Sequence, residues 1–246
     1  MKFNLVRTFI APTALALFVA SASASTIDYS NLSNWTSTGD VATTGNGSIS
    51  LTNASSTYTD DYDSSGNAIK LNLSGTDPVT AGGTLENAVG VQIGGLDLDA
   101  VNQAEEGSAV TLTLTVNVGD TLTIDWNMLT NDTTASGIGA DYFFLTVNGQ
   151  LQILGSSGSA SQASTSANYA AASGAQEATY VFTEAGTVTV GLGVVDVGDY
   201  ANSTEVDLSE VTVTTTAVPE PQTYAMILAG LGGIAAAVQT QRKQQA

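Results

Sequence analysis

Carboxylates are the main reactive side chains of this sequence, and they occur without histidine or cysteine. The 246 residues include 23 Asp and Glu, 5 Lys and Arg, and no His or Cys. These absences exclude disulfides, thiol nucleophiles, triads that use His as the base, and zinc sites ligated by Cys or His. The formal charge of −18 argues against nucleic acid as a partner, because binding it requires a basic surface.

Two carboxylates facing each other across a cleft would suit a glycoside hydrolase. Asp125, in the motif TIDWN, and Asp141 flank an aromatic-rich segment and form the best pair of this kind. The competing interpretation is that both are strand-end or turn aspartates, which bond to nearby backbone groups. Because a carboxylate pair is a weak signal, we predict that the protein is not an enzyme and keep a secreted carbohydrate-active hydrolase as the alternative.

Calcium is the cofactor that the acidic loops suggest, since it takes oxygen ligands from carboxylates and carbonyls. Between residues 25 and 217 the only basic residue is Lys70, whereas every acidic residue except Glu220 lies in this part of the chain. The candidate ligands form three clusters, which are Asp60, Asp61 and Asp63; Asp97 and Asp99; and Asp196, Asp199, Glu205 and Asp207. None of them matches an EF-hand loop.

Sugar binding would need exposed aromatic rings beside polar loops. The candidates for a glycan site are Trp35, Tyr58, Tyr62 and Tyr200. Tyr58 and Tyr62 flank the first acidic cluster and Tyr200 follows Asp199, which suggests a calcium-assisted site. Trp126, in contrast, lies on the apolar face of a predicted strand and is expected in the core.

The pattern of apolar and polar residues is that of β-strands. Residues 110–118 alternate Val or Leu with Thr or Asn, which is the period of a half-buried strand. Signals for hairpin turns lie at Gly119-Asp120, Asn148-Gly149 and Ala185-Gly186. A phase slip after Leu208 predicts a β-bulge. We therefore expect an all-β fold, an antiparallel β-sandwich of jelly-roll type.

The first 24 residues have the form of a secretory signal peptide. A basic start is followed by an apolar run over residues 9–20, and Ala22 and Ala24 form a small-residue cleavage site. We predict that signal peptidase removes residues 1–24 and leaves a β-sandwich ectodomain over residues 25–217.

The C-terminal segment, residues 218–246, has three parts. Pro219, Glu220 and Pro221 come first, an apolar stretch follows over residues 224–238, and Arg242 and Lys243 come next. The stretch is shorter than the roughly 20 residues that span a bilayer. Its composition and its basic end predict a thin transmembrane helix.

This segment, VPEPQTYAMILAGLGGIAAAVQTQRKQQA, resembles the PEP-CTERM sorting signal of Gram-negative bacterial surface proteins. Residues 219–221 match the Pro-Glu-Pro triplet and residues 224–232 match the usual helix, although residues 239–241 separate the helix from the basic pair. The resemblance implies that an exosortase processes the tail during export and that the tail attaches the protein transiently to the inner membrane. It also implies a final place in the envelope, on the outer surface or in the extracellular matrix, in association with exopolysaccharide.

Residues 28–213 resemble an ectodomain that recurs upstream of such tails, through segments such as NLSNWTSTGDV and DYFFLTVNG. No enzymatic activity is assigned to that ectodomain, so the resemblance points to no reaction. We therefore predict a non-enzymatic exported surface protein that contacts exopolysaccharide of a biofilm matrix through weak polar contacts and cation bridges. A structural matrix protein without a specific ligand is the further alternative.

Overall fold

The computed structural model describes residues 23–45, 47–59, 61–62, 66–132, 139–217 and 221–244. Ser25–Thr216 forms one compact unit, and the C-terminal helix belongs to another. Each unit is described by itself below.

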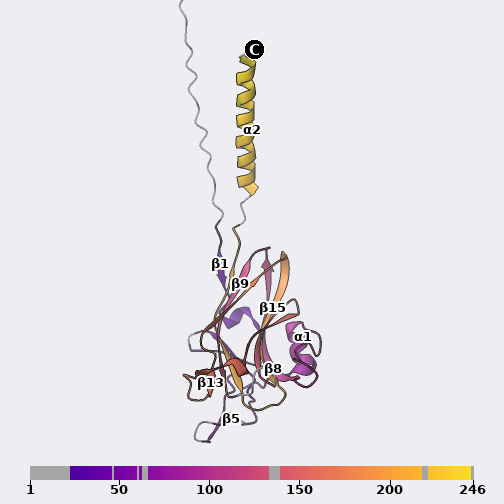
Figure 1. Cartoon of the computed structure of the whole chain (residues 1–246), viewed down its shortest axis with the longest axis vertical. Helices are drawn as coiled ribbons and strands as arrows, with labels where there is room; N and C mark the ends of the chain where they lie inside the picture. Colours follow the sequence, from indigo (N-terminus) through magenta and orange to yellow (C-terminus); the bar gives the residue numbers. More distant parts are fainter. Residues whose placement is uncertain are drawn as a thin grey trace, which may run out of the picture. The chain divides into compact units, whose positions relative to one another are not determined.

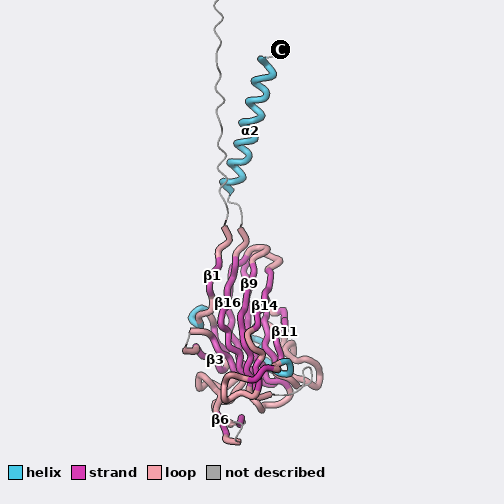
Figure 2. The backbone as a smooth tube through the Cα atoms, turned by 60° about the vertical axis from the view of Figure 1, so that its left-hand side comes forward, coloured by secondary structure: helices cyan, strands magenta, loops and turns pink. Residues whose placement is uncertain are grey.

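The compact unit is built from two main antiparallel sheets. The eight-stranded sheet contains β1 (Thr26–Asp28), β3 (Asp40–Thr43), β4 (Ile49–Thr52), β9 (Thr121–Thr130), β12 (Gln162–Ala163), β13 (Ala171–Ala172), β14 (Gln176–Val181) and β16 (Thr204–Thr214). The six-stranded sheet contains β2 (Thr36–Thr38), β7 (Val79–Thr80), β8 (Ala104–Val116), β10 (Tyr142–Val147), β11 (Gln150–Ser156) and β15 (Gly186–Val197). Figure 2 shows β1, β16, β9 and β14 side by side, in the order that their pairing gives.

The remaining elements are short. They are η1 (Leu32–Asn34), the strand pair β5 (Asp61–Tyr62) and β6 (Ala68–Ile69), η2 (Ala81–Leu85), α1 (Glu86–Val89) and η3 (Ser157–Ser159). Figure 1 shows α1 beside the six-stranded sheet. The architecture confirms the predicted antiparallel β-sandwich, while its jelly-roll connectivity stays a prediction.

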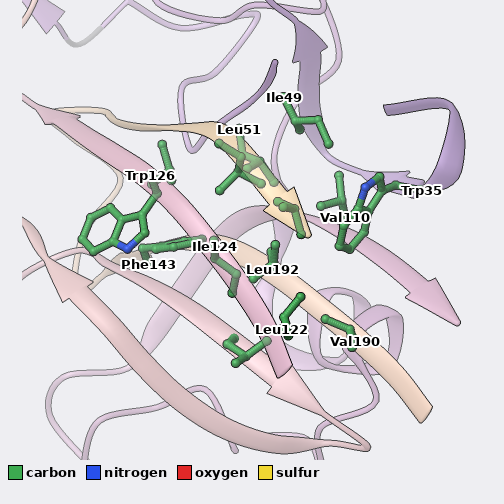
Figure 3. Packing of buried hydrophobic residues seen from close by; sticks show 14 of the residues in the cluster. Trp35, Ile49, Leu51, Val110, Leu122, Ile124, Trp126, Phe143, Val190 and Leu192 are labelled. Carbon is green, nitrogen blue, oxygen red and sulfur yellow. The ribbon is translucent and has the colours of Figure 1, made fainter. Parts of the chain in front are cut away.

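The main core lies between the two sheets. Alternate residues of each long strand point inward, so β9 contributes Leu122, Ile124 and Trp126 to the same cluster as Leu192 of β15. Figure 3 shows Trp126 next to Phe143, and their ring centroids lie 5.1 Å apart. The burial of Trp126 confirms its predicted place. A second cluster fills the other face of the six-stranded sheet, beneath η2 and α1.

One of the three predicted hairpins forms. β10 and β11 pair through Asn148-Gly149, whose φ angles of 49° and 75° are those of a type I′ turn. The register of β16 against β9 shifts between Leu208 and Glu210, which confirms the predicted bulge.

The other two predicted hairpins are wrong, because each turn joins strands of different sheets. Gly119-Asp120 leads from β8 to β9, and Ala185-Gly186 leads from β14 to β15. The strands on either side of each turn face each other through their apolar side chains instead of sharing a ladder. The two connections bond to each other, since Gly119 N donates to Phe182 O at 2.8 Å and Phe182 N donates to Asp120 O at 2.9 Å.

The C-terminal helix α2 spans Pro221–Gln244. Polar residues occupy both of its ends, among them Gln222 and Gln241. Within the described parts of the chain, no helix is long and apolar enough to cross a membrane, so the transmembrane helix expected over residues 224–238 is not found.

Several predicted processing residues lie outside the described ranges. They are Ala22, Pro219 and Glu220. Pro221 begins α2, Arg242 and Lys243 lie in its last turn, and Ala24 directly precedes the compact unit. Cleavage after Ala24 stays a prediction.

Candidate functional site

Strand β16 runs from one end of the β-sandwich to the other. At its last residues Thr214 pairs with Thr26, and Thr215 N donates to Ser25 O at 2.8 Å. At its first residue Thr204 N donates to Oδ1 of Asn53 at 2.6 Å. The unit therefore begins and ends at one end of the sandwich (Figure 1), and the loops that follow β4 and β15 lie at the opposite end.

A pocket of about 510 Å³ opens among these distal loops, and we call it the two-tyrosine pocket. It is lined by Ser55, Tyr58, Asp77, Glu106 and Tyr200. Tyr58 is 75% exposed and Tyr200 is 54% exposed, so both rings offer open faces. Two of the four predicted glycan residues, 142 positions apart in the chain, thus meet at one site.

Asp77 holds the loop that carries Tyr58. Its Oδ1 accepts hydrogen bonds from Ser56 N at 2.7 Å and from Ser55 Oγ at 3.1 Å, and Ser55 Oγ in turn accepts from Tyr58 N at 3.1 Å. The bond from the Ser56 backbone is the main reason that the pKa of Asp77 lies below its ordinary value. The pocket therefore presents a charged carboxylate beside Tyr58 at neutral pH.

Tyr200 is held from the other side. Its Oη donates to Oε2 of Glu105 at 3.0 Å, and this bond is the main cause of its raised pKa. Tyr200 also borders a neighbouring pocket of about 290 Å³, to which Glu86, Asp97 and Glu105 contribute. Tyr200 thus lines both the two-tyrosine pocket and this neighbouring acidic pocket.

A buried polar cluster joins the two sheets beneath the same loops. Asp141, just before β10, is 2% exposed, and its Oδ2 accepts from Thr204 Oγ1 at 2.6 Å and from Asn53 Nδ2 at 2.8 Å. Burial raises the pKa of Asp141 to about 8. Asp196, also 2% exposed, has its pKa raised to about 10 by burial and then by the charge of Asp141, and its Oδ1 has no hydrogen-bond partner.

The predicted catalytic pair is not brought together. Asp125 pairs with Glu177 on β14 and with Glu210 on β16, near the middle of the eight-stranded sheet. Asp141 lies at the sheet end marked by Thr204 and has almost no exposed surface. The two carboxylates therefore do not share a cleft.

The predicted calcium ligands are dispersed and mostly bonded to nearby groups. Asp99 accepts from Val101 N, Asp199 accepts from Ala201 N, and Asp61 accepts from Ser203 N and Oγ. Asp97 accepts from Ala104 N. Asp60 and Asp63 lie outside the described residues. Among the residues that the structure describes, no three acidic side chains are placed to hold a metal ion.

Glu205 and Asp207 lie on β16, away from the two-tyrosine pocket. Burial and the charge of Asp207 raise the pKa of Glu205 to about 7, and Ser50 Oγ donates to Asp207. Asp207 borders a polar pocket of about 540 Å³. Trp126, the aromatic side chain among the described residues that line this pocket, is 5% exposed and belongs to the core.

Trp35 corrects one prediction for the glycan site. It is 8% exposed and packs in the main core, and its Nε1 donates to Tyr29 O at 2.7 Å. Satisfying the indole N–H within the chain lets the ring be buried, so Trp35 offers no open face. Tyr62 is 60% exposed but does not line the two-tyrosine pocket.

Sequence reasoning missed Ser55, Asp77 and Glu106. Asp77 precedes Pro78 in a turn-rich segment, and Glu106 lies in a strand opposite Asp196, so neither has a local pattern that marks a site. The pairing of β8 with β7 places Glu106 opposite Thr80, close to Asp77, and the pairing of β8 with β15 places it near the loop that carries Tyr200.

Residues 217–243 match the family model for the PEP-CTERM protein-sorting motif. The chain thus carries a PEP-CTERM motif, as its tail sequence predicts, and is an exported protein that exosortase sorts to the cell envelope or surface. The sequence matches none of the curated proteins.

Solved structures with a similar arrangement come from larger proteins. A family two carbohydrate esterase from Cellvibrio japonicus is 13% identical at a TM-score of 0.33, with 81% of this chain and 36% of that chain covered. A β-glucosidase from Kluyveromyces marxianus is 10% identical at a TM-score of 0.27, with 74% and 18% covered. The chain spans about a third or less of these proteins, and likeness at such scores does not bear on its function.

Proposed function

We propose that the compact unit is a non-enzymatic matrix protein that binds exopolysaccharide of a biofilm through the two-tyrosine pocket. The observation that carries the proposal is the meeting of two exposed tyrosine rings and two carboxylates at the end of the sandwich opposite Thr26 and Thr214. That position leaves the pocket on the side away from the sorting motif's point of attachment to the unit.

The chemistry of the pocket suits a sugar. Exposed aromatic faces pack against the apolar C–H faces of pyranose rings, and carboxylates accept hydrogen bonds from hydroxyl groups. The volume of about 510 Å³ lies within the range of small-molecule sites, roughly 300–1,000 Å³. A short stretch of a polysaccharide would fill it.

Binding is favoured over hydrolysis by the role of Asp77. A hydrolase needs one carboxyl that keeps its proton and a second that stays charged, both facing the scissile bond. The pKa of Asp77 is lowered, so Asp77 does not supply the protonated carboxyl, and its Oδ1 is already engaged with Ser55 and Ser56 in holding the loop. The hydrolase alternative would be supported by reducing ends released from a bound oligosaccharide.

Calorimetry of the purified full chain with oligosaccharides tests the proposal. Tyr58→Ala removes an exposed ring and is expected to weaken binding about tenfold without changing Tm. The matched control is Val118→Ala, an exposed residue in the turn between β8 and β9 that does not line the pocket. Equal loss in both variants, or no binding by the parent chain, would reject the pocket as a glycan site.

Calcium and the inner membrane belong to the same proposal as partners during and after export. Calcium would offset the acidic loops and bridge them to anionic matrix. Titration of the full chain with millimolar calcium, compared with an EDTA-treated sample, is expected to give heat and a higher Tm. Transient contact of the tail with the inner membrane predicts that unprocessed chains sediment with that membrane when exosortase is absent.

A further inference from the structure

We infer that the two-tyrosine pocket selects a saccharide whose units carry protonated amino groups. This inference rests on the proposed function, because it names the class of sugar that the same pocket binds. Neutral and amine-bearing oligosaccharides differ in one group, so the two ideas can be separated by experiment.

The described residues that line the pocket are acidic or uncharged, and none of them is basic. Asp77 and Glu106 are its charged members, and Glu105 lies next to it through its bond with Tyr200. Lys70, the only basic residue between residues 25 and 217, does not line the pocket, and its Nζ donates to Ser56 O at 3.3 Å. A carboxylate bonds an ammonium more strongly than a hydroxyl, because the hydrogen bond is charge-assisted.

The tyrosine faces add a second preference for a cation. An ammonium within about 6 Å of a ring centroid is attracted by the negative face of the ring. Tyr58 and Tyr200 are both exposed on the pocket wall, and the bond from Tyr200 Oη to Glu105 holds one ring in place. A sugar that carries an amine would contact both rings and both carboxylates.

A buried carboxyl behind the pocket gives an independent reason. Asp196 lies directly opposite Glu106 in the β8–β15 ladder, is 2% exposed, and has an Oδ1 without a hydrogen-bond partner. The charge of Glu106 is one of the causes that raise the pKa of Asp196, so a cation bound at Glu106 relieves this unfavourable effect on Asp196. A neutral ligand brings no such relief.

The size of the pocket separates this ligand from a bare metal ion. The volume of about 510 Å³ exceeds what one ion fills, and the described residues include no group of three acidic side chains suited to a metal. Open aromatic faces suit a ring-shaped ligand, since they bury its apolar face while the carboxylates meet its amine.

The probes are hexamers of glucosamine, N-acetylglucosamine and glucose, titrated into the full chain at a pH at which the amines are protonated. We expect the glucosamine hexamer to bind about tenfold more tightly than the other two. Glu106→Gln is expected to abolish this difference, and added salt is expected to reduce it. Acetylation removes the charge and keeps the ring, so the comparison isolates the amine.

A matched variant controls for the charge of the whole protein. Glu177→Gln removes the same charge from the exposed strand β14, which does not line the pocket, and is expected to keep the preference. Thermal melts of both variants check that they fold, and Tyr200→Ala provides a second test in the pocket if Glu106→Gln does not fold.

Each outcome has a defined meaning. Equal binding of the three hexamers would overturn the inference and leave the proposed function standing, whereas no binding of any hexamer would end both. Equal loss of the preference in Glu106→Gln and Glu177→Gln would assign it to general charge attraction and overturn the inference. Equal or tighter binding of hexalysine, with the same dependence on Glu106, would assign the pocket to a basic peptide and also overturn it.

Discussion

Asp40 and Ser74 are joined by two hydrogen bonds to a single oxygen. Ser74 N and Oγ donate to Oδ1 of Asp40 at 2.7 and 2.6 Å. The other oxygen, Oδ2, accepts from Leu73 N at 2.8 Å and from Thr52 Oγ1 at 2.7 Å. Asp40 is fully buried, and these hydrogen bonds stabilise its carboxylate and tie the loop before β7 to the edge of the larger sheet.

Replacing Asp40 by Asn is expected to destabilise the fold by about 3 kcal/mol. Both carboxylate oxygens face a backbone N–H, so the amide group of Asn would place its own donor against a donor in either orientation. Urea unfolding of the Asp40→Asn chain measures the loss. Stability equal to that of the exposed control Glu184→Gln would contradict the argument.

The same chemical change at Asp196 is expected to have the opposite sign. Asp196 is buried among other carboxyls and keeps its proton in the fold at pH 8, which costs stability, whereas a neutral amide avoids that cost and loses no hydrogen bond at Oδ1. Asp196→Asn should stabilise the chain at about pH 8 by about 1 kcal/mol, which raises Tm by about 2–4 °C in a domain of this size. A lower Tm than that of the parent chain would refute this account.

Stability is expected to fall as the pH rises from about 5 to about 9. Glu205, Asp141 and Asp196 have pKa values raised to about 7, 8 and 10, so the folded chain keeps protons that the unfolded chain has already lost. For each of these carboxyls, the free energy of unfolding falls by about 1.4 kcal/mol per pH unit between its ordinary pKa and its raised pKa in the fold. Asp77, Asp99 and Asp120 have lowered pKa values and act in the opposite direction only under more acidic conditions.

Thermal melts across this range test the prediction. The curve of Tm against pH should decline for the parent chain and become flatter in Asp196→Asn. A constant Tm, or one that rises with pH, would show that the buried carboxyls are not protonated in the fold.

Gly155→Ala is expected to destabilise the chain by about 1–3 kcal/mol. An added Cβ would lie 3.0 and 3.1 Å from Cζ3 and Cζ2 of Trp126 and closer still to Cη2, and this ring is fixed against Phe143. The control is Gly82→Ala, where nothing lies within 4 Å of an added Cβ. Denaturant unfolding of both variants compares them, and equal midpoints would contradict the packing described here.

The strands and their inward residues could be predicted from alternation, because period 2 determines which side of a sheet a residue faces. Trp126 is an example, and so is the turn at Asn148-Gly149. The partners of each strand could not be predicted at Gly119-Asp120 and Ala185-Gly186. A Gly-containing turn fixes only the local direction of the chain, and packing of the apolar faces decided between a hairpin and a crossing to the other sheet.

The site was predictable only in part. Tyr58 and Tyr200 have the composition of exposed loops, but their meeting depends on long-range strand pairing. Trp35 has equally polar neighbours and is nevertheless buried in the main core, where its indole N–H donates to the Tyr29 carbonyl. Asp77 is indistinguishable from other turn aspartates until its bonds to Ser55 and Ser56 are seen.

The adjacency of Ser25 and Thr215 has a practical consequence. Their backbones are hydrogen-bonded to each other, so the chain enters and leaves the compact unit at adjacent positions. The whole β-sandwich can therefore be grafted as a cassette into a surface loop of an unrelated host, with its distal loops projecting outward.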